Sequence, residues 1–205
     1  MGKHGTEYAR LERDLYPTPS WVIDALAEHV DLRWLTVWEP DCGSGDMAEA
    51  LRRTGCAGVY MSDIVDCGQQ HELLDFTSER NPEIEARFNA IVTNPPFGQS
   101  GSLASAFINA GLKRLGSGGL LALLLPCDFD SAKTWARYFA DCPDFVAKIA
   151  LTRRIVWFQR DDGIREAPKE NHAWFLWHRS PLCVCRAPVI LYAPSINGAA
   201  ERAMA

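Results

Sequence analysis

Two consecutive prolines, Pro95 and Pro96, stand directly after an apolar run that ends at Thr93. Proline has no backbone N–H and holds φ near about −65°, so a pair of prolines cannot continue a buried strand. The residue before a proline is also held in an extended conformation. We therefore predict a strand over residues 88–93 that ends in a rigid corner, Asn94-Pro95-Pro96-Phe97.

This corner places hydrogen-bond acceptors beside an aromatic ring. Asn94 offers a side-chain amide oxygen, Pro95 a backbone carbonyl and Phe97 a flat ring. Two acceptors can hold the two N–H groups of an exocyclic amine while the ring stacks on the attached base. The structural alternative is a proline-terminated strand followed by a core phenylalanine, and other motifs of the chain decide between the two.

A second informative turn lies where the β-rich run 35–39 meets Gly43-Ser44-Gly45. Residues 46–53 then have a helical pattern, and we expect Asp46 to be the N-cap. A strand, a glycine turn and a helix can cradle a nucleotide, because glycine permits close approach of the ligand. Ala48 stands where the dinucleotide fingerprint has its third glycine, so this motif alone is weak evidence.

Acidic and amide side chains fall at the ends of four predicted strands. Glu39 ends the first strand, Asp63 the second, Asp75 lies at the end of a short third strand near 73–76, and Asn94 follows the fourth. Because ligands bind at the carboxyl ends of parallel strands, we expect one crevice to collect these side chains. An acid in the place of Asp63 can accept both hydroxyls of a ribose.

The rest of the chain alternates between helices and strands. Helices are predicted over 20–30, 102–115 and 131–140, the last with Ser131 as N-cap, and strands over 119–125, 145–151, 155–158 and 173–177. This alternation predicts an α/β fold with a Rossmann-like, doubly wound and mostly parallel sheet.

Taken in order, these motifs resemble those of class I S-adenosylmethionine-dependent methyltransferases, in particular bacterial and phage DNA N6-adenine methyltransferases. The similarity covers about residues 16–178: Tyr16-Pro17-Thr18-Pro19 is similar to the N-terminal cofactor motif, residues 39–45 to the glycine-rich loop and Asn94-Pro95-Pro96-Phe97 to the catalytic motif. The resemblance implies seven strands with an antiparallel last strand, a place that the strand around Trp174 would fill. Phe97 departs mildly from the family, where tyrosine is common.

The resemblance also implies which residues meet the cofactor and the acceptor. The catalytic residues are Asn94, Pro95, Pro96 and Phe97. The residues expected to bind S-adenosylmethionine are Tyr16, Pro17, Thr18, Glu39, Pro40, Cys42, Gly43, Gly45, Asp63, Ile64, Asp75 and Phe76. We identify no general base, because the histidines have no visible partners, and no metal site, because no second pair accompanies Cys183 and Cys185.

Composition is that of a compact cytoplasmic protein. The 205 residues are 47% hydrophobic, enough for one substantial core. No apolar run reaches the ~20 residues of a membrane helix, so we expect no membrane partner. Seven cysteines, an odd number without a CxxC pair, are typical of reduced thiols. We expect an N-terminal extension (1–15), a single domain (16–192) and a C-terminal tail (193–205).

Charge is unevenly distributed along the chain. Residues 148–186 carry eight Lys/Arg against four acids, a net of +4, whereas residues 1–147 carry a net of −9. Within the basic segment, the residues expected to bind the substrate alternate cations with rings: Arg153, Arg154, Trp157 and Phe158, which act together with Phe97. A solvated loop of mixed charge is the alternative.

We therefore expect the substrate to be nucleic acid, in the first place DNA. Only about 27 residues follow residue 178, so we expect relaxed specificity, or specificity supplied by a partner subunit or a second copy of the chain. RNA base methyltransferases and protein glutamine methyltransferases share the same type of corner, and a non-catalytic cofactor-binding module is a third alternative. The arginine and aromatic segment favours nucleic acid over a protein amide.

Overall fold

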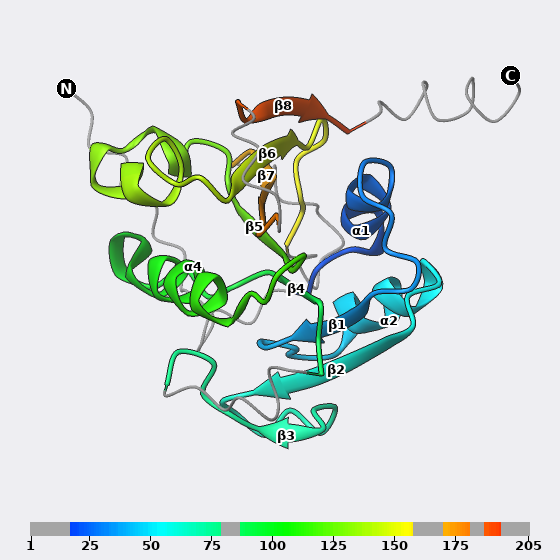
Figure 1. Ribbon diagram of the computed structural model, residues 1–205. Helices are drawn as coiled ribbons and strands as arrows, with labels where there is room; N and C mark the ends of the chain where they lie inside the picture. Colours follow the sequence, from blue (N-terminus) through cyan, green and yellow to red (C-terminus); the bar gives the residue numbers. More distant parts are fainter. Residues whose placement is uncertain (1–16, 79–86, 158–169, 181–186, 194–205) are drawn as a thin grey trace, which may run out of the picture.

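Eight strands form one twisted sheet in the order β3-β2-β1-β4-β5-β7-β6-β8 (Figure 1). The computed structural model describes residues 17–78, 87–157, 170–180 and 187–193, and the structural statements below concern those residues. The strands are β1 (Thr36–Glu39), β2 (Gly58–Asp63), β3 (Glu72–Leu73), β4 (Ala90–Thr93), β5 (Leu120–Pro126), β6 (Phe145–Ala150), β7 (His172–His178) and β8 (Val189–Tyr192).

The sheet is mostly parallel. Neighbouring strands from β3 to β5 run parallel, and β7 runs antiparallel to both β5 and β6. The predicted α/β fold with one antiparallel strand around Trp174 is therefore confirmed. The predicted count of seven strands is wrong, because residues 189–192 add the short edge strand β8. The apolar residues Val189–Tyr192 form this strand at the exposed edge of the sheet, where the sequence analysis assigned no strand.

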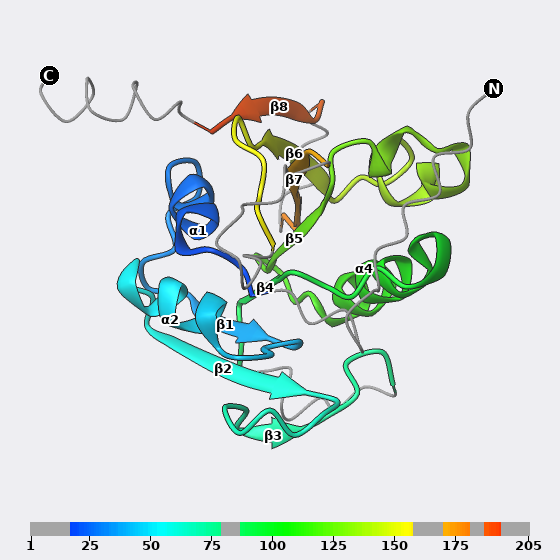
Figure 2. The same cartoon turned by 180° about the vertical axis from the view of Figure 1, so that it is seen from behind.

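Helices cover both faces of the sheet (Figures 1 and 2). Helices α1 (Ser20–Ala27) and α2 (Asp46–Arg53) pack on one face, and α4 (Ser102–Arg114) packs on the other. The short 3-10 helix η2 (Gln99–Gly101) leads into α4, while η3 (Phe129–Ser131) and η4 (Lys133–Tyr138) lie on the α4 side. Among the described residues, no helix combines the length and the apolar character needed to cross a membrane.

Three local predictions differ from the structure. Gly45, with φ of +84°, is the N-cap of α2, and Asp46 is the first helical residue instead. Residues 131–140 form no α-helix, because the extended Ala132 separates η3, which ends at Ser131, from η4. Residues 155–157 form no strand. Each error concerns local backbone structure that depends on packing, and none changes the order of the strands in the sheet.

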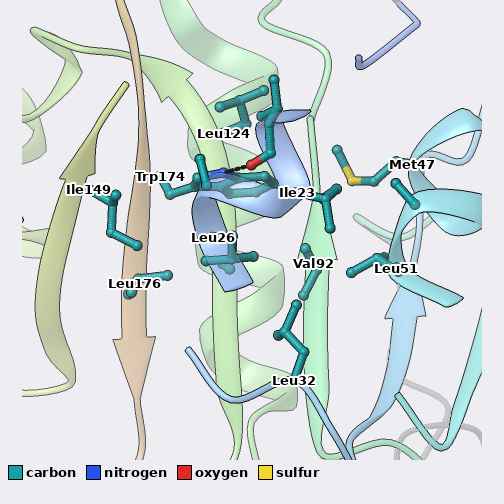
Figure 3. Close-up of a cluster of buried hydrophobic side chains, with 14 of the residues drawn as sticks. Ile23, Leu26, Leu32, Met47, Leu51, Val92, Leu124, Ile149, Trp174 and Leu176 are labelled. Carbon is teal, nitrogen blue, oxygen red and sulfur yellow. Dashed lines mark hydrogen bonds between the residues drawn. The ribbon is translucent and has the colours of Figure 1, made fainter. Parts of the chain in front are cut away.

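Trp174 of β7 connects α1 to the sheet by a hydrogen bond and by apolar packing (Figure 3). Its indole Nε1 donates a 2.8 Å hydrogen bond to the backbone carbonyl of Val22, and the side chain is fully buried. Ile23 and Leu26 of α1 belong to the same apolar cluster, which reaches Met47 of α2. The buried indole therefore helps to fix where α1 begins, directly after Pro19.

We expect Trp174→Phe to lower the free energy of unfolding by about 2 kcal/mol, because it shortens a buried side chain and leaves the Val22 carbonyl without its donor. Chemical denaturation measures the change. Trp34→Phe is the matched control, since Trp34 is 82% exposed, and it should change stability by less than about 0.5 kcal/mol. Equal effects of the two substitutions would show that the indole hydrogen bond contributes nothing.

Candidate functional site at the carboxyl edge of the sheet

Three of the predicted site residues lie at the ends of adjacent parallel strands. Glu39 is the last residue of β1, Asp63 is the last residue of β2, and Asn94 directly follows β4. Strand β1 lies between β2 and β4, so the three ends share one edge of the sheet. Asp75 lies two residues beyond the end of β3. The predicted placement at strand ends is confirmed for Glu39, Asp63 and Asn94, whereas the third strand ends at Leu73, before Asp75.

The glycine turn after β1 is bound to the end of β2. The Gly43 N–H donates to Asp63 Oδ2 at 3.0 Å, and the Val65 N–H donates to Asp63 Oδ1 at 2.9 Å. Gly43 and Gly45 both have positive φ, +48° and +84°, so the turn requires glycine at these two positions. Asp63 therefore shapes the cradle, a role that local sequence could not reveal. Its contact with a ribose stays a prediction.

Glu39 is a buried carboxyl group that lacks a full set of partners. It is 2% exposed, and its Oε2 has no hydrogen-bond partner among the described residues. Burial, followed by the nearby charge of Asp41, raises the pKa of Glu39 well above its ordinary value. A buried acceptor without a donor is rare in proteins. A cationic group, such as the ammonium of an amino acid, fits this oxygen in charge and in hydrogen bonding.

Two other predicted cofactor residues have side chains in the core. Cys42 is buried beside Ala48 and Met61, and burial raises the pKa of its thiol to about 12. The Phe76 ring is 2% exposed, and its centroid lies 5.1 Å from the rings of both Trp38 and Phe107. Both side chains are packed in the core, and their contact with the cofactor stays a prediction.

Other predicted cofactor residues are more open. The side chain of Ile64, which follows Asp63, is 65% exposed and can lie against a flat ligand. The carboxylate of Asp75 accepts hydrogen bonds from the N–H and the hydroxyl of Thr77, at 2.8 and 2.7 Å. Tyr16 lies outside the described residues.

The catalytic corner is joined to the N-terminal segment. Asn94 Nδ2 donates a hydrogen bond to Thr18 Oγ1 at 3.3 Å, which connects two positions that are 76 residues apart in the chain. Thr18 is buried and lies directly between Pro17 and Pro19. The structure therefore brings together the two proline motifs that the sequence analysis treated separately.

Phe97 packs against a second aromatic ring. Its centroid lies 5.8 Å from that of Phe129 at an interplanar angle of 76°, and Phe129 stacks on Trp135. Gly101, with φ of +79°, permits this packing, because a Cβ atom there would lie 2.8 Å from the Phe129 ring. Phe97 remains partly exposed, so part of its ring is available to a substrate.

The arginines predicted to bind substrate already have partners within the chain. The Arg153 guanidinium lies over the Trp21 ring of α1, 4.5 Å from its centroid. Arg154 Nε donates to Asn171 Oδ1 at 2.8 Å. Both arginines are exposed, so their guanidinium groups are accessible to phosphates. The sequence contains no direct signal for either intramolecular contact.

Trp157 packs edge to face with His172, with ring centroids 5.3 Å apart. Burial lowers the pKa of His172 to about 4, so this histidine is neutral at physiological pH. Phe158, Cys183 and Cys185 lie outside the described residues.

No protein-family model matches the sequence, and no curated protein matches it. Solved structures do match the fold. A Listeria monocytogenes protein described as a class I S-adenosylmethionine-dependent methyltransferase has a TM-score of 0.59 at 11% identity, over 90% of this chain and 67% of that one. A protein described as a modification subunit of a type I restriction enzyme, from Vibrio vulnificus, has a TM-score of 0.60 at 15% identity, over 89% of this chain and 48% of that one.

A Pyrococcus horikoshii protein described as an RNA methyltransferase has a TM-score of 0.58 at 12% identity, over 80% of this chain and 87% of that one. At these identities the similarity establishes the fold of the chain. The chain spans about half the length of the Vibrio modification subunit.

We expect Glu39→Gln to weaken the binding of S-adenosylmethionine and to remove its pH dependence. In the wild-type protein the raised pKa of Glu39 means that the carboxyl group gains a proton as pH falls, and a cationic group then binds less tightly. Calorimetry between about pH 5 and pH 8 measures affinity and proton release. Glu49→Gln, an exposed acid on α2, is the control and should keep the wild-type pH dependence.

The same substitution should stabilise the protein without ligand at pH 8. A carboxyl group with a raised pKa in the folded state supports folding at low pH, and this support is lost as pH rises through the folded pKa. Glutamine has the same shape and avoids burying a charge. If Glu39→Gln and Glu49→Gln have the same stability and the same pH dependence of S-adenosylmethionine binding, Glu39 does not contact the cationic group.

Proposed function

We propose that this protein is an S-adenosylmethionine-dependent methyltransferase that acts on the N6 amine of adenine in DNA. The observation that carries the proposal is the Asn94-Pro95-Pro96-Phe97 corner, which directly follows β4, at the carboxyl edge of the sheet that also bears the glycine turn and Asp63. The methyltransferase fold of the solved neighbours supports the reaction class. The two hydrogen-bond acceptors and the aromatic ring of the corner support an amine as the acceptor of the methyl group.

The residues present fit the proposed cofactor in chemistry. Bound S-adenosylmethionine supplies a methyl group on a positively charged sulfur atom. The unpartnered Oε2 of Glu39 can accept from the ammonium group of its amino acid part. The glycine turn, held by Asp63, leaves room for backbone contact, and the exposed Ile64 can cover one face of a flat base.

The corner would prepare the acceptor amine for attack. The lone pair of an adenine amine is delocalised into the ring, so the nitrogen is a poor nucleophile. Hydrogen bonds from its two N–H groups to Asn94 Oδ1 and to the Pro95 carbonyl favour a tetrahedral nitrogen whose lone pair points at the methyl group. The target base must leave the DNA duplex, and Phe97 would stack on it.

This scheme needs no dedicated base. His172 is neutral and, with its pKa lowered to about 4, is a weak proton acceptor. After methyl transfer the methylated nitrogen is strongly acidic and loses its proton to water. Positioning and hydrogen bonding by the corner therefore account for the chemistry that the protein itself contributes.

DNA is proposed as the substrate on two grounds. The exposed guanidinium groups of Arg153 and Arg154 are placed one after the other beyond β6, where they can meet phosphates. One of the solved neighbours is described as a modification subunit of a restriction enzyme. We propose that specificity is relaxed or is supplied by a partner subunit, and that the protein acts in the cytoplasm.

We expect Asn94→Ala to abolish methyl transfer while cofactor affinity changes by less than about twofold, because the amide oxygen serves the acceptor and the amide nitrogen is bound to Thr18. Transfer of labelled methyl to DNA, RNA and total protein, measured side by side, tests the activity and the substrate together. Asn109→Ala, an exposed asparagine on α4, is the control and should be fully active. If only glutamine or only RNA is methylated, the substrate is protein or RNA and not DNA. If Asn94→Ala remains active, the corner has a structural role and not a catalytic one.

We expect Arg153→Met to weaken DNA binding and to reduce the slope of log K against log salt by about one unit, as for one lost phosphate contact. Methionine keeps an unbranched chain against Trp21, so packing on α1 is preserved. The loss should be similar for different DNA sequences, because phosphates carry no base identity. Arg33→Met, on the loop before β1, is the control. An equal change in DNA affinity and salt slope in both variants would show that Arg153 makes no specific contact with DNA.

A further inference from the structure

Two segments whose backbone is restricted by prolines meet at the catalytic corner. Thr18 lies between Pro17 and Pro19, and Asn94 precedes Pro95 and Pro96, so both residues are held in extended backbone. Their side chains are joined by the 3.3 Å hydrogen bond from Asn94 Nδ2 to Thr18 Oγ1. Thr18 is 5% exposed, so water does not readily replace this contact.

Helix α1, which follows Thr18, fixes the position of the backbone that carries the Thr18 hydroxyl. Pro19 is the N-cap of α1, and its carbonyl accepts the Val22 N–H at 3.0 Å. The Val22 carbonyl in turn accepts the buried Trp174 indole at 2.8 Å (Figure 3). Two hydrogen bonds, joined through Val22, thus link β7 to Pro19, which directly follows Thr18.

The orientation of the Asn94 amide decides whether the corner can hold an amine. An asparagine side chain has an oxygen at one end and an NH2 group at the other, and the two ends have nearly the same shape. With Nδ2 bound to Thr18, Oδ1 is the end left for the acceptor. A flipped amide would direct its own N–H groups at the N–H groups of the amine, and donors repel donors.

We propose that Thr18 is a positioning residue, which holds the Asn94 amide with its oxygen toward the acceptor amine. This inference rests on the proposed function, because it assigns to Thr18 a part in the same reaction. The hydroxyl proton of Thr18 then points away from Asn94. An acceptor that takes this proton, such as a carboxylate of the bound cofactor, strengthens the orientation, because Oγ1 can then only accept from Asn94.

Steady-state kinetics with Thr18→Val and Thr18→Ser test the proposal. At saturating cofactor, with adenine-containing duplex DNA as the acceptor, Thr18→Val should lower kcat about tenfold, as expected for the loss of one orienting hydrogen bond. The KM for DNA should change less than about twofold, and Thr18→Ser should restore kcat. A residue that only binds cofactor would raise the cofactor KM and leave kcat at saturation unchanged, which would overturn the proposal.

Thr93→Val is the matched control. Thr93 is also buried and directly precedes the corner, but its Oγ1 has no hydrogen-bond partner among the described residues. The substitution removes a buried hydroxyl of the same kind without touching the Asn94 amide. We expect kcat to remain within about twofold of the wild type. An equal loss of kcat in Thr93→Val and Thr18→Val would mean that any change in local packing disturbs the corner, and would overturn a specific role for Thr18.

A second measurement is independent of activity. In protein labelled with 15N-asparagine, the Asn94 side-chain signals are identified by their loss in Asn94→Ala. The Nδ2 protons should exchange with water about tenfold faster in Thr18→Val than in the wild type or in Thr18→Ser. If the wild-type protein methylates no acceptor, the proposed function fails, whereas the exchange rates still decide whether Thr18 orients Asn94. Unchanged exchange in Thr18→Val would overturn the inference.

Discussion

The buried hydrogen bond from the Trp174 indole to the Val22 carbonyl supports much of the candidate site. The other described contacts between α1 and the sheet are mainly non-directional apolar packing. With the indole hydrogen bond, the start of α1 has a defined position, and the Pro17–Pro19 segment reaches the corner at Asn94. A side chain near the end of the described chain thus controls the position of a segment near its beginning. The site is a product of tertiary structure, although its motifs are local.

Negative charge is the second constraint on the site. The pKa of Glu39 rises because the side chain is buried and because Asp41, Asp63 and Asp46 lie near it. These neighbouring charges oppose the ionisation of Glu39 and favour a cationic ligand. The Asp63 carboxylate is stabilised by two backbone N–H groups, so it can shape the glycine turn. Among the described residues, no donor supports Glu39 Oε2 in this way, so a cationic ligand would stabilise Glu39 more than Asp63.

The strand ends could be predicted from the sequence, whereas most of the contacts between them could not. Prolines and glycines mark turns whatever surrounds them, so Glu39, Asp63 and Asn94 could be placed at strand ends in advance. The burial of Phe76 beside Trp38 and the packing of Arg153 on Trp21 depend on which elements become neighbours. Residues 131–140 have helical residue types, yet the extended Ala132 divides them into two 3-10 turns. No local pattern encodes these outcomes.

The place of β7 in the sheet has a consequence for the order of folding. Strand β7 lies between β5 and β6, so β6 can join the sheet only together with or after β7, which follows it in the chain. Strands β1, β2, β4 and β5 need no later segment for their mutual pairing. During synthesis, the half of the molecule that carries the glycine turn can therefore assemble early. The Arg153 segment, which directly follows β6, reaches its place on α1 only when the last buried strand has docked.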